Sequence, residues 1–436
     1  MLRLILAILF FSNILCAEDD FSEFDETSTS KSNIEFNGFV EFEQGIRGSN
    51  SHRSDEFVLA NRRIRLQSNK SFDRGGFYAK FDFLNDDIED LNTVDIREMR
   101  LQYKLTDNTD ISVGRQVTTW GVADMLFIND LFPKNWIANF QGRDMEMLKE
   151  PSNSVRITSY IDSFTFDFVY QPKFTPDIVP RGCKFSVFDP NSNAIGANSS
   201  ACGTKYSSGR NNNRFNEGEF AVSVKKQFGN HEWAIYGYKG FTKAPKALNY
   251  NGTTFTPFHS RLNVYGVSQE GQFGPGILIF EAGYYDSIDD KNGLDYFIPN
   301  SKIKALLGYR QDLSGKLSYG LQVYQEKIFN YKQYESSYLS NNSTGYAFRL
   351  KEYQHTLTLR LTYKLQQETL LVSLFTYIRP NDKDSFTKLE ISKKLDDNFK
   401  ITSGANIFTG KVNYESREFG MLKDDDNYFV RFNYLF

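Results

Sequence analysis

Four histidines are the residues of this chain whose chemistry would suit acid–base or nucleophilic catalysis: His52, His231, His259 and His355. A catalytic histidine needs a hydroxyl or carboxylate group beside it. His259 is followed directly by Ser260, whereas His231 follows a turn and His355 falls on an apolar face. The sequence therefore favours a protein that is not an enzyme, with no metal site and no cofactor.

Cysteine supplies a second kind of chemistry. Cys183 and Cys202 both lie in the long polar segment 173–213. Two cysteines with no histidine between them make a poor zinc site. In an exported protein they meet oxidising conditions, so we expect a disulfide. By the chain-entropy model, closing a loop of roughly 20 residues would contribute about 3 kcal/mol to the order of that loop.

The third kind of chemistry is the binding of charged solutes by arginine and lysine. In several segments a basic or polar residue alternates with an apolar one, as in Arg360-Leu361-Thr362-Tyr363-Lys364. A period of two places the polar side chains on one face of a strand and the apolar ones on the other. The residues that this alternation assigns to a solute-contacting face are Arg63, Arg65, Arg100, Lys104, Arg261, Arg310 and Arg360.

Three arginines break the pattern. Strict alternation puts Arg62, Arg97 and Arg115 on the apolar face of their strands. A β-bulge turns a side chain to the other face, and a position at a strand end lets it reach water. The sequence does not say which of the two applies to each arginine.

The elements that carry these residues are alternating segments that continue from about residue 34 to the end of the chain. We count about 18 strands, and about 16 stays open because 34–48 and 164–172 alternate least clearly. Short turns and mostly long connections follow one another, which is typical of outer-membrane barrels. A soluble sandwich has no reason to keep that order over so long a chain. We expect an all-β fold: a transmembrane antiparallel β-barrel with short periplasmic turns and long extracellular loops.

The N-terminus supports export. Residues 1–17 combine a charged start, an apolar run and a small residue at Ala17, which predicts a cleaved signal peptide. Lipid attachment at Cys16 is less favoured, because Leu15 stands where a small residue is preferred. The acidic, aperiodic residues 18–33 predict a periplasmic leader, and 34–436 the barrel.

The C-terminus supports the same destination. From Tyr428 onward every second residue is aromatic or β-branched, and the chain ends in Phe436. This resembles the terminal strand by which outer-membrane barrels are recognised for assembly, with Tyr434 and Phe436 as the signal residues. It implies the barrel assembly machinery, membrane lipid and lipopolysaccharide as partners.

The composition agrees with a barrel. Only 40% of the residues are hydrophobic, yet the chain has 40 Phe and 25 Tyr. A barrel wall needs apolar side chains at half of its strand positions and concentrates aromatic residues at the membrane interfaces. The net charge of −3 lacks the basic excess that nucleic-acid binding requires.

The connection 119–152 changes the period. Met125, Ile128, Leu131 and Phe132 recur at three to four residues and predict a short amphipathic helix that ends at Pro133. An apolar helix must bury its face. The inner wall of the barrel is the nearest surface and would make the loop a constriction or plug; a cap that packs on other external loops is the alternative.

The same region carries a family resemblance. It resembles the porin-like outer-membrane barrels that include alginate-export-type channels, through the residues Gly114-Arg115-Gln116, Trp120-Gly121, Asp124, Asp130 and Pro133. The motif covers only about residues 94–136. It implies a wide barrel with a basic lumen that passes anionic or polar organic solutes. It also implies that Trp120, Asp124, Asp130 and Pro133 belong to the constriction loop.

These observations predict a channel in the outer membrane of a Gram-negative bacterium. We expect passive diffusion of small polar solutes, with anions preferred, because alternation assigns more basic than acidic side chains to the lumen. The alternative for the charges is an inert wall in which they pair with one another. The alternatives for the protein are an adhesin or receptor that acts through 173–213 and 329–349, or the barrel component of an export system. The oligomeric state stays open between monomer and homotrimer.

Overall fold

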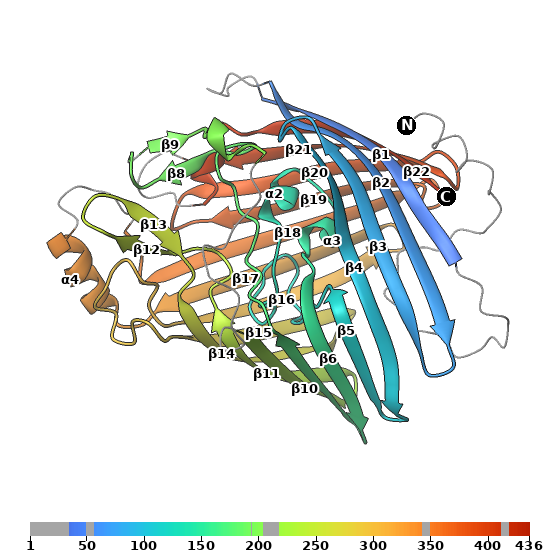
Figure 1. The fold of residues 1–436 in the computed structure, drawn as a ribbon, viewed down its shortest axis with the longest axis horizontal. Helices are drawn as coiled ribbons and strands as arrows, with labels where there is room; N and C mark the ends of the chain where they lie inside the picture. Colours follow the sequence, from blue (N-terminus) through green and yellow to red (C-terminus); the bar gives the residue numbers. More distant parts are fainter. Residues whose placement is uncertain (1–34, 49–55, 193, 204–217, 342–348, 411–417) are drawn as a thin grey trace.

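Eighteen strands form one closed antiparallel sheet in the computed structural model (Figure 1). The sheet closes because the first strand pairs with both the second and the last. The structure describes residues 35–48, 56–192, 194–203, 218–341, 349–410 and 418–436. The predicted signal peptide, the predicted leader and His52 lie outside these residues.

Every strand of the barrel pairs with its neighbours in chain order, apart from short hairpins in two connections. The barrel strands are β1 (Glu35–Arg47), β2 (Phe57–Phe72), β3 (Gly75–Asp86), β4 (Leu91–Thr106), β5 (Thr109–Gln116), β6 (Ser152–Ile161), β7 (Phe164–Gln171), β10 (Glu219–Phe228), β11 (His231–Phe241), β14 (Arg261–Phe273), β15 (Gly276–Ser287), β16 (Lys302–Ser314), β17 (Leu317–Ile328), β18 (Tyr353–Leu365), β19 (Leu370–Arg379), β20 (Asp384–Lys394), β21 (Phe399–Thr409) and β22 (Asn427–Leu435). The prediction of an all-β antiparallel barrel is confirmed, and eighteen rather than sixteen is the number of strands.

The two ends of the barrel differ. One end, called the turn end, holds the start of β1, the end of β22 and tight turns such as the one from β14 to β15. The other, called the loop end, holds the long connections (Figure 1). The short elements in these connections are β8 (Val187–Asp189), β9 (Ala194–Gly196), η1 (Ser199–Ala201), β12 (Ala247–Tyr250), β13 (Phe255–Phe258), α4 (Tyr331–Asn341) and η3 (Gly420–Leu422).

The outer face of the wall is apolar. On β22 the exposed fractions of Tyr428, Val430 and Phe432 are 48%, 40% and 51%. Phe429 and Arg431, which alternate with these residues, are each only 3% exposed. The outward side chains of this strand are apolar, as membrane barrels require, while the inward ones include both the apolar Phe429 and the charged Arg431. The backbone of Phe436 also pairs with that of Gly38 on β1.

A β-bulge decides the position of Arg97. The pairing of β3 with β4 shifts register between Lys80 and Phe81, so that Arg97 on β4 has no direct partner. The extra residue turns Arg97 inward, where it is 4% exposed. Arg62, in contrast, stays exposed and pairs with Asp87 at the loop end.

Two further helices lie within the ring of strands: α2 (Trp136–Phe140) and α3 (Met145–Leu148) (Figure 1). None of the helices in the part of the chain that the structure describes is long and apolar enough to cross a membrane.

Candidate functional site

The connection between β5 and β6, residues 117–151, runs through the inside of the barrel and is called the inner loop. Its N-terminal half contacts β15, β17, β18 and β19, and its C-terminal half contacts β1, β2, β4 and β22. These two groups of strands belong to opposite parts of the ring. The inner loop therefore crosses the barrel interior.

Glu281 on β15 is the main anchor of the N-terminal half. Its carboxylate accepts hydrogen bonds from the backbone N–H groups of Val122, Ala123 and Asn129, at 3.0, 3.0 and 2.7 Å. Glu281 is only 1% exposed. Since a buried carboxylate needs donors to replace water, the carboxylate and the loop satisfy each other.

A small residue on the wall permits this close approach. A Cβ atom at Gly266 on β14 would lie 1.6 Å from Oδ1 of Asn129. The amide of Asn129 donates to the carbonyl oxygens of Val267 and Ala282, both at 3.3 Å. A side chain at 266 would therefore force the Asn129 amide out of this position.

Asp124 is the second anchor. Its backbone N–H lies 2.8 Å from Oε1 of Gln322 on β17, and Gln322 donates back to the carbonyl oxygen of Asp124 at 2.8 Å. Its carboxylate receives the guanidinium of Arg360 on β18. Asp124 is thus fixed to two neighbouring strands.

The predicted helix over Met125 to Phe132 is wrong, because this stretch has no regular secondary structure. The physical reason is that the wall takes the backbone groups a helix would use. Glu281 and Gln322 accept from the N–H groups of residues 122–124 and 129, and Tyr377 donates to the carbonyl oxygen of Met125 at 2.8 Å. The burial that motivated the prediction is nevertheless real: Met125 and Ile128 are 5% and 0% exposed.

Trp120, Asp130 and Pro133 also lie in the inner loop. The indole N–H of Trp120 donates to Asp167 on β7 at 3.0 Å. Asp130 pairs with Lys134 at 2.9 Å. The carbonyl oxygen of Pro133 accepts from the backbone N–H of Glu150 at 3.0 Å, which joins the middle of the loop to its C-terminal end.

Arg143 anchors the C-terminal half. Its guanidinium donates to Glu41 at 2.5 Å and to Glu43, both on β1. Arg431 on β22 donates to Glu43 at 2.7 Å. All four side chains are nearly excluded from solvent. Removing charged groups from water costs free energy, and the several hydrogen bonds among these four side chains offset that cost.

Glu146 on α3 makes the next contact along the loop. Its Oε1 atom lies 2.6 Å from Nη1 of Arg65 on β2 and 2.7 Å from Nζ of Lys80 on β3. Burial alone would raise the pKa of Glu146, but these two cations lower it to about 2. Arg65 also forms a bidentate pair with Asp82, at 2.6 and 2.7 Å.

The predicted solute-contacting residues have different positions. Arg63 is buried, with Nη1 2.5 Å from Asp82 and 3.4 Å from the sulfur of Met147. Arg310 pairs with Glu270 within the barrel. The guanidinium of Arg100 lies over the ring of Tyr78, 5.2 Å from its centroid. Lys104 occupies the same face of β4 as Arg100, nearer the turn end.

Arg261 is not in the lumen, which corrects the prediction. It is the first residue of β14, at the loop end, where its side chain is 61% exposed and pairs with Asp289 at 2.6 Å. Alternation from Leu262 and Val264, which pack inside, puts Arg261 on the outer face. The assignment is wrong because the inward residues at this end of β14 are apolar, so that polarity does not mark its inner face.

The balance of charge inside the barrel is closer to neutral than predicted. Alternation counted wall residues only, and it left out the acids of β1 and of the inner loop. Five acidic residues pair with arginines of the wall: Glu41 with Arg63, Glu43 with Arg431, Asp124 with Arg360, Glu146 with Arg65 and Glu150 with Arg97. Much of the predicted basic excess is thereby compensated.

Apolar contacts hold the inner loop on both sides. One cluster joins Trp120, Ile128 and Phe132 to inward residues of β7, β10, β11 and β14–β16. The other joins Met125 and Leu148 to inward residues of β2 and β19–β22. Each half of the wall thus has its own core with the inner loop.

A cavity of about 300 Å³ adjoins the inner loop. Its wall combines apolar side chains with charged ones, as small-molecule sites commonly do. The residues that line it are Thr119, Trp120, Gly121, Val122, Ala123, Leu126, Phe127, Asp130, Met145, Lys149, Glu270, Glu281 and Arg310. Glu270 and Arg310 place it on the turn-end side of the loop, since both lie near the turn ends of their strands.

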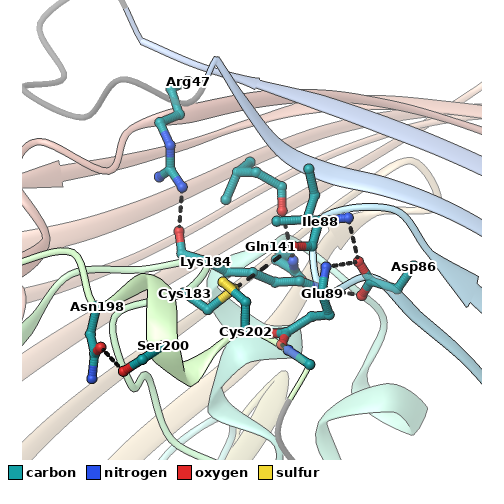
Figure 2. Close-up of a disulfide and its surroundings, with 12 residues drawn as sticks. Arg47, Asp86, Ile88, Glu89, Gln141, Cys183, Lys184, Asn198, Ser200 and Cys202 are labelled. Carbon is teal, nitrogen blue, oxygen red and sulfur yellow. Dashed lines mark hydrogen bonds and ion pairs between the residues drawn. A yellow bond between two sulfur atoms is a disulfide. The ribbon is translucent and has the colours of Figure 1, made fainter.

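The predicted disulfide is present. The sulfur atoms of Cys183 and Cys202 are 2.05 Å apart, in the connection from β7 to β10 (Figure 2). Next to it, Arg47 on β1 donates to the carbonyl oxygen of Lys184 at 2.6 Å, and Lys184 pairs with Asp86 on β3.

Residues 182–186, here called the strap, include Cys183 of the disulfide and enter the barrel mouth. Phe185 in the strap is fully buried, and its ring lies 5.8 Å from that of Phe140 on α2. The backbone N–H of Ser186 donates to Asp425 at 2.7 Å. Sequence reasoning missed the strap because no periodicity marks it; the aromatic residue beside Cys183 was its only signal.

The segment before the strap is bonded to the inner loop directly. Asp177 accepts from the backbone N–H of Lys134 at 2.9 Å and from the indole N–H of Trp136 at 3.0 Å. The backbone N–H of Ile178 donates to Lys134 at 2.8 Å. Two loops therefore form one hydrogen-bonded unit at the loop end.

The histidines in the described residues occupy different surroundings. Nδ1 of His259 lies 2.7 Å from the carbonyl oxygen of Thr242, and its ring packs on Phe174. Nδ1 of His231 lies 2.7 Å from Nε2 of Gln269. Within the described ranges, no three His, Cys, Asp or Glu residues are grouped so as to hold a metal ion.

Comparison with known proteins bears on the fold. No family model and no curated protein matches the chain. A BenF-like porin from Pseudomonas fluorescens aligns with a TM-score of 0.54 and 8% identity, over 93% of this chain and 98% of that one. OccK11 (OpdR) of Pseudomonas aeruginosa gives 0.53 and 8%, over 92% and 95%. The outer-membrane protein opdK of the same species gives 0.51 and 9%, over 93% and 99%.

At these identities the likeness shows the fold. The particular resemblance to alginate-export-type channels stays a prediction. The chain has the eighteen-stranded fold of the Gram-negative outer-membrane β-barrels that include these porins.

Proposed function

We propose that the protein is an outer-membrane channel for the passive diffusion of small polar solutes. One observation carries the proposal: a single loop crosses a closed barrel and is fixed to opposite walls, with a partly polar cavity of about 300 Å³ beside it. An inert barrel needs no such loop. A constriction that combines charged and apolar contacts is suited to select among small solutes.

The preference for anions belongs to the same proposal. Arg65, Lys80, Arg100 and Lys104 follow one another along the inner faces of β2, β3 and β4 toward the turn end. Arg65 and Lys80 form ion pairs with carboxylates, which reduces the positive electrostatic potential that they produce in the lumen. The cross-strand neighbours of Arg100 are Tyr78 and Gly114, and neither is acidic. Arg100 is therefore the residue from which we expect most of the anion preference.

Reversal potentials in planar bilayers under a salt gradient test the proposal. We expect stable openings with anions more permeant than cations, and a lower permeability ratio in Arg100→Ser. Arg62→Ser is the matched control, because Arg62 is exposed at the loop end. Absence of conductance by correctly folded protein would refute the channel. An unchanged ratio in Arg100→Ser would refute the role of Arg100.

The assembly role of Tyr434 and Phe436 and the homotrimer are also part of this proposal. The outward position of Phe436, which is 38% exposed, supports recognition by the assembly machinery. Deletion of Phe436 should lower the amount of heat-modifiable barrel in the membrane. Light scattering of the purified protein distinguishes a monomer from a trimer.

The receptor interpretation has less support. It relies on the connections 173–213 and 329–349, and the strap of the first packs into the barrel mouth through Phe185. Export through a larger machine has no supporting contact among the described residues.

A further inference from the structure

One carboxylate oxygen of Glu146 is shared by two cations of the wall. Oε1 lies 2.6 Å from Nη1 of Arg65 and 2.7 Å from Nζ of Lys80. The side chain of Glu146 is 42% exposed, whereas those of Arg65 and Lys80 are 2% and 13% exposed. The anion therefore reaches the cations from the solvent side of the lumen.

The wall leaves one donor of Arg65 for this contact. Nε and Nη2 are used by Asp82, at 2.6 and 2.7 Å. Nη1 is directed at Glu146. The other carboxylate near Lys80, that of Glu98, lies farther away, at 3.7 Å. Nη1 of Arg65 and Nζ of Lys80 together form a place for one carboxylate that the wall itself does not fill.

The backbone around Glu146 is fixed independently of its side chain. Arg97 donates to the carbonyl oxygens of Glu146 and Lys149, at 3.1 and 2.7 Å. Met147 and Leu148 are 7% and 1% exposed. Rotation of the Glu146 side chain thus frees the two cations without moving α3.

We propose that Arg65 and Lys80 form a carboxylate-binding site in the lumen and that Glu146 is its tethered occupant, displaced by a solute carboxylate during passage. This inference rests on the proposed channel function, and it adds that Glu146 regulates access of solutes to the site formed by Arg65 and Lys80. The exchange replaces one charge-assisted pair by another of the same kind. Because a tethered group competes at an effective concentration of about millimolar or above, dilute solutes leave the site closed.

Glu146→Gln tests the competition directly. The amide keeps the length of the side chain but loses its charge, and neutral hydrogen bonds are roughly half as strong as charge-assisted ones. We therefore expect the apparent dissociation constant for propionate to fall by about tenfold. It is measured by calorimetric titration of the purified full-length barrel in detergent, with heat-modifiability as the check that each variant is folded.

Asp144→Asn is the matched control. It removes one negative charge from the same loop, but its side chain is 60% exposed and faces Arg431 at 3.8 Å. It should leave propionate binding unchanged, and Lys80→Gln combined with Glu146→Gln should abolish the gain. Equal effects of Asp144→Asn and Glu146→Gln, or no effect of Glu146→Gln, would overturn the inference.

The same variants separate this inference from the proposed function. If the protein does not conduct in bilayers but its Glu146→Gln variant binds propionate more tightly, the carboxylate-binding site is supported and the channel function is refuted. If the protein conducts but Glu146→Gln does not change propionate binding, the channel function is supported and the role of Glu146 as a tethered occupant is refuted.

Discussion

Arg360 on β18 holds Asp124 of the inner loop with two donors, and its Nη2 atom lies 2.8 Å from Oδ1 of Asp124. The two residues are 236 positions apart in the sequence. A guanidinium fork fixes the orientation of a carboxylate as well as its distance. This pair thereby sets how far the N-terminal half of the loop extends from the wall.

Loss of this pair should widen the channel. In Arg360→Ala we expect larger and noisier single-channel currents, because Asp124 keeps its bonds to Gln322 but loses its lateral restraint. The side chains are about one-third exposed, so the cost in stability should be about 1 kcal/mol or less. Lys364→Ala on the same strand, where Lys364 pairs with the exposed Glu368, should leave the currents as they are. Identical currents in both variants would contradict this role.

Glu281→Ala should release the loop without opening the barrel. Three backbone N–H groups lose their buried acceptor, and each orphaned donor costs about 1–3 kcal/mol. We expect hydrogen exchange at the amides of Val122, Ala123 and Asn129 to accelerate by about tenfold or more. Amides of β15 itself should keep their protection. Glu270→Ala serves as the control, since Glu270 pairs with Arg310 instead; similar exchange in both variants would argue against the anchor.

The disulfide should order the loop that it closes, between Cys183 and Cys202, and not the barrel. Replacing Cys183 and Cys202 by serine removes about 3 kcal/mol of chain-entropy restraint, so cleavage by a nonspecific protease between 187 and 203 should accelerate by up to about 100-fold. Reduction of the wild type should give the same pattern. Cleavage within the barrel strands, or no acceleration at all, would show that the restraint lies elsewhere.

The contact of Glu146 predicts a definite pH dependence. Burial raises its pKa, but Arg65 and Lys80 outweigh burial and lower it from 4.5 to about 2. A group whose pKa is lowered on folding stabilises fully above its unfolded value and loses that contribution as the pH falls toward the folded value. The contact should therefore be constant above pH 4.5 and weaken toward pH 2. Carbon-13 NMR of the Glu146 carboxyl group checks this; a transition near neutral pH would contradict it.

Alternation alone predicted the strands well, because a wall between lipid and water forces a period of two on every strand. It failed where local pairing departs from that rule. Arg97 faces inward through a bulge that depends on the register of β3 and β4, which the sequence of β4 does not contain. Arg261 obeys the alternation of β14, but the prediction assigned the wrong face, because the inward residues at that end, Leu262 and Val264, are apolar.

The site was less predictable than the wall. Trp120, Asp124, Asp130 and Pro133 all lie in the inner loop, but the helix expected there does not form. A helix depends on hydrogen bonds within the segment, and Glu281 supplies a competing acceptor from more than 150 positions away. The partners of Arg65 and Arg143 could not be predicted for the same reason, since Glu146 and Glu41 lie 81 and 102 positions away from them.

The salt bridges of Arg143 have a consequence for the order of folding. Arg143 binds Glu41 and Glu43 on β1, and Glu43 also binds Arg431 on β22. These two strands form the seam between the beginning and the end of the barrel. On β22, Arg431 and Asn427 also donate to the carbonyl oxygens of Gly142 and Phe140, at 3.4 and 3.3 Å, so the contacts of the inner loop with this seam are complete only when the last strand has been added. Seating of the inner loop must be a late event in biogenesis, and a barrel caught with its seam open would be wide, unselective and leaky.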